Sequence, residues 1–387
     1  MLTELFGKKR NRLLIINRTF WPENDVLGAA LLKTAFKLCD NYKVYIQCIS
    51  ETDVACKVKE KFGLNDLGFL VQKGSSNSQK SILYRIIQNI VFSLKAIFSI
   101  LSLKPKVIYI STDPPLMAPF FTIIIGRLCG AKIVYHLQDI HPEAAGLLFK
   151  INPALKSLLR KIESISVRLS SNVIVLSSKM KETVSLLTKG VEEKIITLNN
   201  CAPQAQIAKE KKKGVIFCGN LGRFQKVEYI LSEIDAYFKE GGIMPMTFIG
   251  GGIHTEIVSN ASQDHKNLDF FGKLSFLESS KILSEYKWAI LSIDTEVLKY
   301  AYPSKLSSYL IHGCNVIFVT DHQNDFSDLI AETKQGIACT AERGHLVEIF
   351  KSIEKDSLQY SPIQRKTLEN FKENIFVDKL SNILNYG

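Results

Sequence analysis

The sequence predicts an α/β protein made of two parallel-sheet domains that face each other across a cleft. Apolar runs typical of buried strands alternate with segments of helical periodicity, and this alternation occurs twice along the 387 residues. The length also favours two domains, because one domain usually holds about 100–200 residues. Parallel sheets bind ligands at the carboxyl ends of their strands, so we expect the site in the cleft.

The first series of elements opens with a buried-type run over residues 13–16 and a helix over Leu27–Leu38. Further strand-like runs follow at 44–49, 107–110, 132–136 and 173–176. A turn-like LNNCAP segment at 198–203 and a charged run at 209–213 then interrupt the pattern. The second series has strand-like runs at 215–218, 246–249, 268–271, 288–293 and 316–320, and residues 362–386 form a helical pattern. We therefore expect domains over 1–203 and 204–365, with a C-terminal helix over 366–387.

Positive charge is concentrated near the N-terminus. The net charge is +11, and Met1–Ile110 holds 17 Lys and Arg against 8 Asp and Glu. Such an excess indicates nucleic acid, an anionic membrane or an anionic substrate as partner. Nucleic acid is not expected, because no DNA-binding motif occurs and basic residues are not interleaved with aromatic ones. Eight scattered cysteines without a C-x-x-C pair predict reduced thiols, and the sequence shows no signal peptide, so we expect a cytoplasmic protein.

Residues 81–106 form an apolar stretch with basic interruptions and no acidic residue. A spanning helix would place Lys95 inside the bilayer at a high free-energy cost. An interfacial helix fits better, with apolar bulk toward the acyl chains and cations toward anionic head groups. We expect this surface to include Arg85, Ile86, Phe92, Lys95 and Ile97. A buried crossover helix whose lysines reach solvent is the alternative.

Two segments of the second series have the features of phosphate-binding sites. The strand-like run at 215–218 opens into GNLGRF, where glycines allow a close backbone approach, a following helix start favours anions, and Arg223 can grip a diphosphate. In YPSKL, Ser304 and Lys305 stand at a predicted helix N-terminus after Pro303. For GNLGRF, the alternative is a tight strand–helix connection that binds no ligand. For YPSKL, the alternative is that Lys305 is simply an exposed lysine in the first turn of a helix. Gly251, in a run of three glycines after a strand, either borders the nucleotide or forms only a turn.

With these segments the chain resembles family 4 glycosyltransferases, especially bacterial enzymes of surface-polysaccharide assembly such as O-antigen and capsule. The resemblance is carried in order by WPE at 21–23 with Gly28, YISTDPPLMAP at 109–119, YHLQDIHPEAA at 135–145, VIVLSS at 173–178, LNNCAP, FCGNLGRFQKVEYIL at 217–231, FIGGG at 248–252 and YPSKLSSYLIHGCNVI at 302–317. It implies a GT-B fold, a nucleotide-sugar donor, retention of anomeric configuration and no metal or other cofactor. It also implies that the C-terminal helix crosses back to the first domain.

The resemblance also implies roles by position. Arg223 and Lys305 correspond to the diphosphate-binding cations, and the donor-domain loop corresponds to Gly219, Asn220 and Gly222. Gly28 corresponds to the N-domain loop that faces the donor. The family usually carries two glutamates eight residues apart, but these positions hold Tyr300 and Ser308 here. We expect Glu296, Asp294 or Ser308 to reach the sugar or ribose instead, and Lys226 to replace a second basic residue of the loop.

The active-site segment implied by the resemblance contains Asp139, His141 and Glu143. Glycosyl transfer needs stabilisation of the departing diphosphate and a partner for the acceptor proton. A carboxylate whose pKa is raised by burial, or a histidine, suits the second task. Helix capping explains Asp139 equally well, and Glu143 can simply favour a helix dipole. A functional and a structural role are equally consistent with His136. We expect His312 to be structural.

These observations predict transfer of a sugar, expected from a UDP-sugar, to a polyprenyl-diphosphate-linked saccharide at the inner face of the cytoplasmic membrane. Two alternatives remain. A UDP-sugar epimerase of GT-B fold would not need the apolar basic surface. A non-catalytic GT-B partner subunit would account for the missing glutamates.

Overall fold

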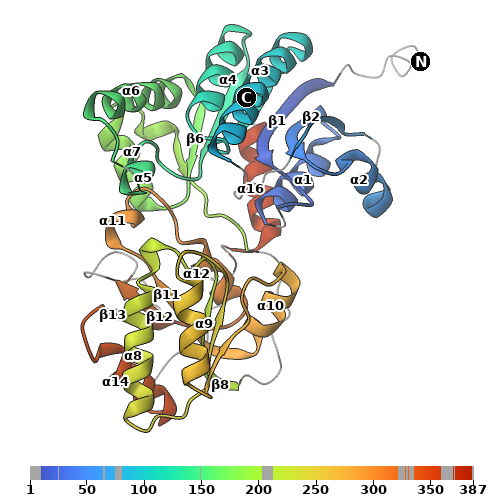
Figure 1. The fold of residues 1–387 in the computed structure, drawn as a ribbon. Coiled ribbons are helices and arrows are strands. Elements are labelled where there is room, and N and C mark those ends of the chain that lie inside the picture. The colour runs from blue at the N-terminus through green and yellow to red at the C-terminus, as the bar shows by residue number, and fades with distance from the viewer. Residues whose placement is uncertain are drawn as a thin grey trace. The chain divides into compact units, whose positions relative to one another are not determined.

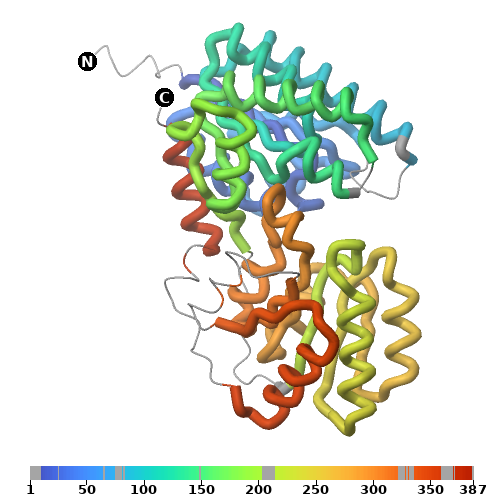
Figure 2. The backbone as a smooth tube through the Cα atoms, turned by 90° about the vertical axis from the view of Figure 1, so that its left-hand side faces the viewer, coloured from blue at the N-terminus to red at the C-terminus, as the bar shows by residue number. Residues whose placement is uncertain are grey.

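The computed structural model describes residues 10–385, apart from 25, 64–65, 75–80, 149, 203–211, 321–326, 328–329, 331–334, 359–368 and 370. The chain divides into two compact units (Figures 1 and 2). Unit 1 comprises Met1–Cys201, Tyr300–Tyr302 and Glu373–Gly387, and unit 2 comprises Ala202–Lys299 and Pro303–Lys372. The expected boundary residue, Pro203, lies outside the described residues. The assignment of residues 300–302 to unit 1 was not foreseen from the sequence.

Unit 1 is built on a seven-stranded sheet in the order β3-β2-β1-β4-β5-β6-β7, and every pairing in it is parallel. The strands are β1 (Asn11–Thr19), β2 (Tyr42–Ser50), β3 (Gly68–Lys73), β4 (Val107–Ser111), β5 (Lys132–Leu137), β6 (Asn172–Val175) and β7 (Ile195–Thr197). The central strands are apolar without alternation because helices cover both faces of the sheet.

Side chains that alternate along β1 supply two separate cores. Leu13 and Ile15 pack with the core of α1 and α16, whereas Leu14 and Ile16 pack with α3, α4 and α6 on the opposite face. Figure 2 shows α3, α4 and α6 side by side. The helices of the unit are α1 (Leu27–Leu38), α2 (Val54–Phe62), α3 (Ile82–Leu103), α4 (Met117–Leu128), α5 (Glu143–Leu148), α6 (Pro153–Leu169), α7 (Ser178–Leu187) and α16 (Glu373–Asn385).

The C-terminal helix α16 packs on α1 in unit 1, as the resemblance implied (Figure 1). Phe376, Leu380 and Leu384 are buried in the core that α1 lines. Lys33 and Lys37 on α1 form ion pairs with Glu373 and Asp378. The predicted start of this helix at 362 lies outside the described residues, but an unbroken helix to the C-terminus was wrong, because Phe371 and Lys372 are not helical and Lys372 forms a parallel bridge with Ala202.

Unit 2 has a six-stranded parallel sheet in the order β10-β9-β8-β11-β12-β13. The strands are β8 (Lys212–Cys218), β9 (Met246–Ile249), β10 (Leu268–Phe270), β11 (Tyr286–Ser292), β12 (Asn315–Thr320) and β13 (Gly336–Thr340). The helices are α8 (Val227–Lys239), α9 (Thr255–Asp264), α10 (Phe276–Ser284), α11 (Thr295–Leu298), α12 (Ser304–Ile311) and α14 (His345–Glu354). The prediction of two parallel-sheet domains is therefore confirmed.

Helix α3 is the crossover between β3 and β4, and it has both of the faces that the sequence left open. One face packs on the sheet through Phe92, Ala96 and Ile100, so the prediction that Phe92 belongs to a membrane surface was wrong. The other face exposes apolar side chains, and Arg85, Ile86 and Lys95 are exposed with them while Ile97 is half-buried. By length and composition alone, Leu83–Leu103 is a helix of the described chain that could cross a membrane.

Candidate active site

Two glycine-rich loops meet at the carboxyl ends of β8 and β9 in unit 2. Gly219 donates its backbone N–H to the carbonyl of Ile249 over 2.8 Å, and Leu221 donates to the carbonyl of Gly251 over 3.0 Å. Gly250 has φ +143°, and a Cβ atom built on it would lie 1.8 Å from the carbonyl oxygen of Gly219. Only glycine tolerates both that backbone conformation and that approach. The two loops therefore leave exposed backbone close to any ligand at this edge.

Replacing Gly250 with alanine should destabilise unit 2, because the Cβ atom must displace the loop that carries Gly219. We expect the melting temperature to fall by about 5 °C or more, since strain of this kind costs about 1–3 kcal/mol. Gly251→Ala is the matched control, because nothing lies closer than 3.8 Å to a Cβ atom there. Equal melting temperatures of the two variants by calorimetry would contradict the tight packing of these loops.

Lys305 lies in the first turn of α12 and extends over the first glycine loop. Its Nζ donates a hydrogen bond to the carbonyl of Asn220 over 3.1 Å and lies 4.2 Å from the ring centroid of Phe217. A Cβ atom on Gly219 would lie 2.3 Å from its Cε, so the absence of a side chain there makes room for the lysine. Burial lowers the pKa of Lys305 to about 8, while the neighbouring Cys218 thiol acts in the opposite sense. An anion bound beside this ammonium would restore the lost stabilisation of its charge.

Arg223 is exposed in a short 3₁₀ turn, Arg223–Gln225, three residues after Asn220. The expected direct passage from the glycine loop into a helix was wrong, because α8 begins only at Val227, after Lys226 in a left-handed conformation. Lys226 is 3.1 Å from Asp294, which neutralises much of its charge. Arg223 has no ion pair among the residues that the structure describes, so its guanidinium is available to an anion at the loop.

The other expected donor-side residues are spread around this edge. Ser304 is exposed at the start of α12, beside Lys305. Glu296 is exposed and pairs with Lys299 at 2.5 Å. The carbonyl oxygen of Ser308 lies 2.7 Å from Nδ1 of His312, a buried ring whose Nε2 contacts Ser280. This enclosure agrees with the structural role expected for His312.

In unit 1, Asp139 follows β5 and forms an antiparallel bridge with Ala301. The next residue, Ile140, donates its N–H to the carbonyl of Tyr300 over 2.8 Å. Burial, and then the negative charge of Asp113, raise the pKa of Asp139 to about 6. A carboxylate that titrates there is ionised at neutral pH yet basic enough to take a proton. The geometry suits general-base chemistry better than helix capping, because no hydrogen bond from a helix N–H to its side chain occurs among the described residues.

Asp113 is a further residue of this site, and it was not among the residues expected from the sequence. It follows β4, and its carboxylate accepts hydrogen bonds from the backbone N–H and the hydroxyl of Thr19 at the end of β1. Arg18 forms an ion pair with the same carboxylate, with its Nε 2.7 Å away. The loop ends of β1, β4 and β5 thus bring Arg18, Asp113 and Asp139 to one edge of the sheet. The sequence signal was the DPP in YISTDPPLMAP, because polar residues directly after parallel strands gather at that edge.

Glu143 and His136, near Asp139 in the sequence, both have structural partners. Glu143 is buried and forms an ion pair with Arg160 on α6. Burial lowers the pKa of His141, with Glu143 opposing this effect. His136 is fully buried, with Tyr109 Oη 2.7 Å from its Nδ1 and Gln138 Nε2 2.9 Å from its Nε2.

Gly28 allows α1 to approach the chain after β1, because a Cβ atom there would lie 2.7 Å from the backbone nitrogen of Trp21.

No protein-family model matches the chain. Over 320 residues it is 26% identical to the probable glycosyltransferase WbjE of Pseudomonas aeruginosa, covering 77% of this chain and 78% of that protein. It is 23% identical over 333 residues to the putative colanic acid biosynthesis glycosyl transferase WcaI of Escherichia coli (strain K12), covering 79% and 81%. The solved lipopolysaccharide outer core galactosyltransferase WaaB aligns over 96% of this chain and 98% of its own, with a TM-score of 0.63 and 12% identity. The chain is a glycosyltransferase of the GT-B fold.

The fold alone does not separate this glycosyltransferase from enzymes of related architecture. The UDP-GlcNAc 2-epimerase from Methanocaldococcus jannaschii aligns over 97% of this chain and all of its own, with a TM-score of 0.60 and 12% identity. The site of the glycosyltransferase therefore has two components to consider separately. Unit 2 carries the two glycine loops with Lys305 and Arg223, and unit 1 carries the carboxylates Asp113 and Asp139.

Proposed function

We propose that this glycosyltransferase belongs to family 4 and moves a sugar, with retention and without a metal, from a UDP-sugar to a polyprenyl-diphosphate-linked saccharide. The product would be a bacterial surface polysaccharide of the O-antigen or capsule type. The names of WbjE and WcaI support the reaction class, and that of WcaI supports polysaccharide synthesis. Asp139 would accept the proton of the acceptor hydroxyl, while the nucleoside diphosphate leaves with the electrons of its bond to the sugar.

The observation that carries the donor assignment is the position of Lys305. Its Nζ lies against the glycine-loop backbone at the carboxyl edge of the unit 2 sheet, with a pKa lowered by burial. A cation held in this way is stabilised by a diphosphate, whose charge increases as the sugar departs. Arg223 and the N-terminus of α12 would add to the same charge stabilisation. These groups supply the positive charge that a divalent metal would otherwise provide.

The acceptor and membrane assignments are supported by the face of unit 1 that α3, α4 and α6 form. This face carries large exposed apolar side chains, and cations but few carboxylates stand among them. Such a surface suits anionic lipid head groups over acyl chains, and we propose that it rests on the inner face of the cytoplasmic membrane. The exposed apolar residues are Leu83, Tyr84, Ile86, Ile87, Ile90, Val91, Leu94, Phe98, Leu101, Met117, Phe121, Leu128, Leu155, Leu158, Ile165 and Leu169.

A non-catalytic partner subunit is the second candidate. One specific observation favours it: Tyr300 and Ser308 stand where the family usually has glutamates. Tyr300 belongs to unit 1, where its carbonyl accepts the hydrogen bond from Ile140, and Ser308 lies on α12. Such a subunit would bind membranes but turn over no nucleotide sugar.

The test is to incubate the purified chain with a panel of nucleotide sugars and measure release of the nucleoside diphosphate. Anionic vesicles, with and without a polyprenyl-diphosphate disaccharide, are added in parallel. We expect slow hydrolysis of one UDP-sugar, faster release with the acceptor, and flotation of the protein with the vesicles. Interconversion of the sugar epimers would assign an epimerase instead. Flotation without turnover of any donor would assign a partner subunit.

A further inference from the structure

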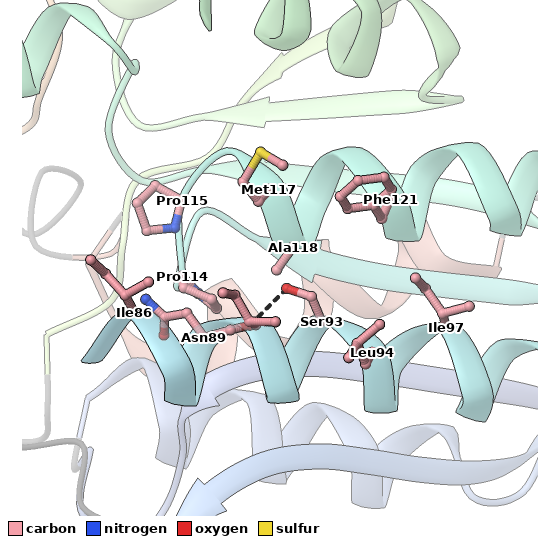
Figure 3. Close-up of a pocket in the computed structure, with 11 residues that line it drawn as sticks. Ile86, Asn89, Ser93, Leu94, Ile97, Pro114, Pro115, Met117, Ala118 and Phe121 are labelled. Carbon is pink, nitrogen blue, oxygen red and sulfur yellow. Dashed lines mark hydrogen bonds between the residues drawn. The ribbon is translucent and has the colours of Figure 1, made fainter. Parts of the chain in front are cut away.

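A groove runs between α3 and α4 on the exposed apolar face of unit 1. It has a volume of about 400 Å³, within the range of about 300–1,000 Å³ that is typical of small-molecule sites. Figure 3 shows α3 forming one wall and α4 with the preceding loop forming the other. Its lining is almost wholly apolar and includes Ile86, Ile90, Leu94, Met117 and Phe121. The groove therefore offers a long apolar guest a place to bind and a polar guest very little.

One end of the groove lies at the candidate active site of unit 1. Pro114 and Pro115 line that end, and they directly follow Asp113 (Figure 3). Asp113 pairs with Arg18 and acts electrostatically on Asp139. The other end lies at Ile97 and Phe121, farther along both helices. A chain lying in this groove would have one end held beside the carboxylates and the rest directed along the membrane-facing helices.

The charges around the groove favour a guest that carries negative charge. No Asp or Glu occurs between Leu67 and Thr112, which includes all of α3. The charged residues of α3 and α4 are Arg85, Lys95 and Arg127, and all three are exposed. Asn89 and Ser93 are the polar residues of the lining, so the groove suits a hydrocarbon chain, which needs no hydrogen-bonding partners.

We propose that this groove binds the polyisoprenyl chain of the lipid-linked acceptor and thereby presents the saccharide at the Asp113–Asp139 edge. The proposal rests on the proposed function, because it assumes an acceptor that carries a lipid. The groove makes a specific contact with the reacting molecule, beyond the general contact of the apolar face with the bilayer. It therefore contributes to acceptor selection.

The test compares two double variants that are matched in exposure on the same helix. Ile90→Asn/Leu94→Asn changes the groove lining, at side chains that are 55% and 61% exposed. Ile87→Asn/Leu101→Asn changes residues outside the lining that are 54% and 52% exposed. All four side chains are accessible, so neither variant is expected to unfold, and circular dichroism and donor hydrolysis verify this.

The readout is kcat/KM in detergent micelles for one saccharide diphosphate carried on a polyprenyl chain or on a short alkyl chain. We expect the unmodified protein to prefer the polyprenyl acceptor about tenfold or more, since several apolar contacts are made only with the long chain. The groove variant should lose this preference while keeping its kcat/KM for the short acceptor and its donor hydrolysis. The matched control should keep the preference.

Three outcomes overturn the proposal while leaving the transferase assignment intact. They are the absence of a chain preference in the unmodified protein, retention of the preference by the groove variant, and equal loss in both variants, which would indicate general contact of the apolar face with the micelle. Absence of donor hydrolysis in the unmodified protein would instead overturn the proposed function.

Discussion

Replacement of Lys305 by alanine is expected to lower the rate of nucleotide-sugar hydrolysis by about 100-fold, the usual effect of removing one group that stabilises developing charge. Lys305→Ala removes the cation from the glycine loop and leaves Arg223 unchanged. We expect the effect mainly in kcat, because charge on the diphosphate increases as the bond to the sugar breaks. Steady-state release of the nucleoside diphosphate measures it directly.

Lys299→Ala is the matched control for this experiment. Lys299 is also in unit 2, but it is paired with Glu296 on α11 and has no contact with the glycine loops among the described residues. Its replacement should leave the rate within about twofold of the original, because an exposed ion pair contributes little. If Lys305→Ala is as active as this control, the donor site has been placed wrongly.

The pH dependence of donor use gives an independent check on Lys305. With a pKa of about 8, its ammonium is charged below that pH and becomes neutral above it. The apparent KM for the donor should therefore rise as the pH increases through about 8, and this rise should be absent in Lys305→Ala. Bound diphosphate favours the charged form of Lys305 and so raises its pKa in the complex. The fall of kcat with increasing pH should therefore occur at a higher pH than the rise of the donor KM.

Asp139→Asn is expected to reduce sugar transfer to the acceptor by about 10²–10⁴-fold, the range for loss of a general base. Because the pKa of Asp139 is about 6, transfer by the unmodified protein should rise as the pH increases through about 6 and then level off. The donor KM should not change, since Lys305 and Arg223 are intact. Normal transfer by Asp139→Asn would exclude this carboxylate as the base.

The same variant should not be destabilised at neutral pH. The pKa of Asp139 is raised on folding, so the native state binds a proton more tightly than the unfolded chain between about pH 4 and 6. The stability that protonated Asp139 contributes is therefore lost as the pH rises through about 6. The amide of the Asp139→Asn variant does not ionise, so the variant does not lose stability in this way. Thermal unfolding at pH 7.5 separates this result from simple misfolding.

Asp113→Asn provides the matched electrostatic variant. Its carboxylate is the charge that raises the pKa of Asp139 after burial, so its removal should move the acidic limb of transfer to lower pH. Arg18 would keep its positive charge without its partner, and this acts in the same direction. An unchanged limb would mean that the two carboxylates do not interact during turnover.

Elements with strong periodicity were predicted well from the sequence. Helix α1 was expected over Leu27–Leu38 and is observed over the same residues, because its apolar residues recur at the spacing of one helix face. The short strand β7 at the sheet edge and the half-buried β13 escaped detection, because neither is a long apolar run. Phe92 was assigned to the wrong face because polar residues do not mark the solvent side of α3: Gln88, Ser93 and Ser99 are buried with Phe92, whereas large apolar side chains are exposed.

The candidate site was predictable where backbone geometry demands particular residues. The structural positions of Gly219 and Lys305 were predicted correctly, because a glycine loop after a parallel strand and a cation at a helix start are both visible in the sequence, whereas their role in binding the donor stays a prediction. The contacts of Asp113 with Arg18 and Thr19 were not predictable. Thr19 and Asp113 are 94 residues apart in the sequence, and only the order of the strands in the sheet brings them together. The ion pair between Glu143 and Arg160 was also not predicted, because it joins two successive helices, α5 and α6, and no motif in the sequence indicates how they pack.

The packing of α16 on α1 affects how the protein forms during synthesis. Unit 1 starts with the first strand of the chain, yet its core requires Phe376, Leu380 and Leu384 from the last helix. The ribosome must therefore deliver the whole of unit 2 before the surface of α1 can be covered. Until then, the nascent N-terminal half presents an apolar surface that is open to aggregation or to chaperones, whereas unit 2 can fold as an intact insert.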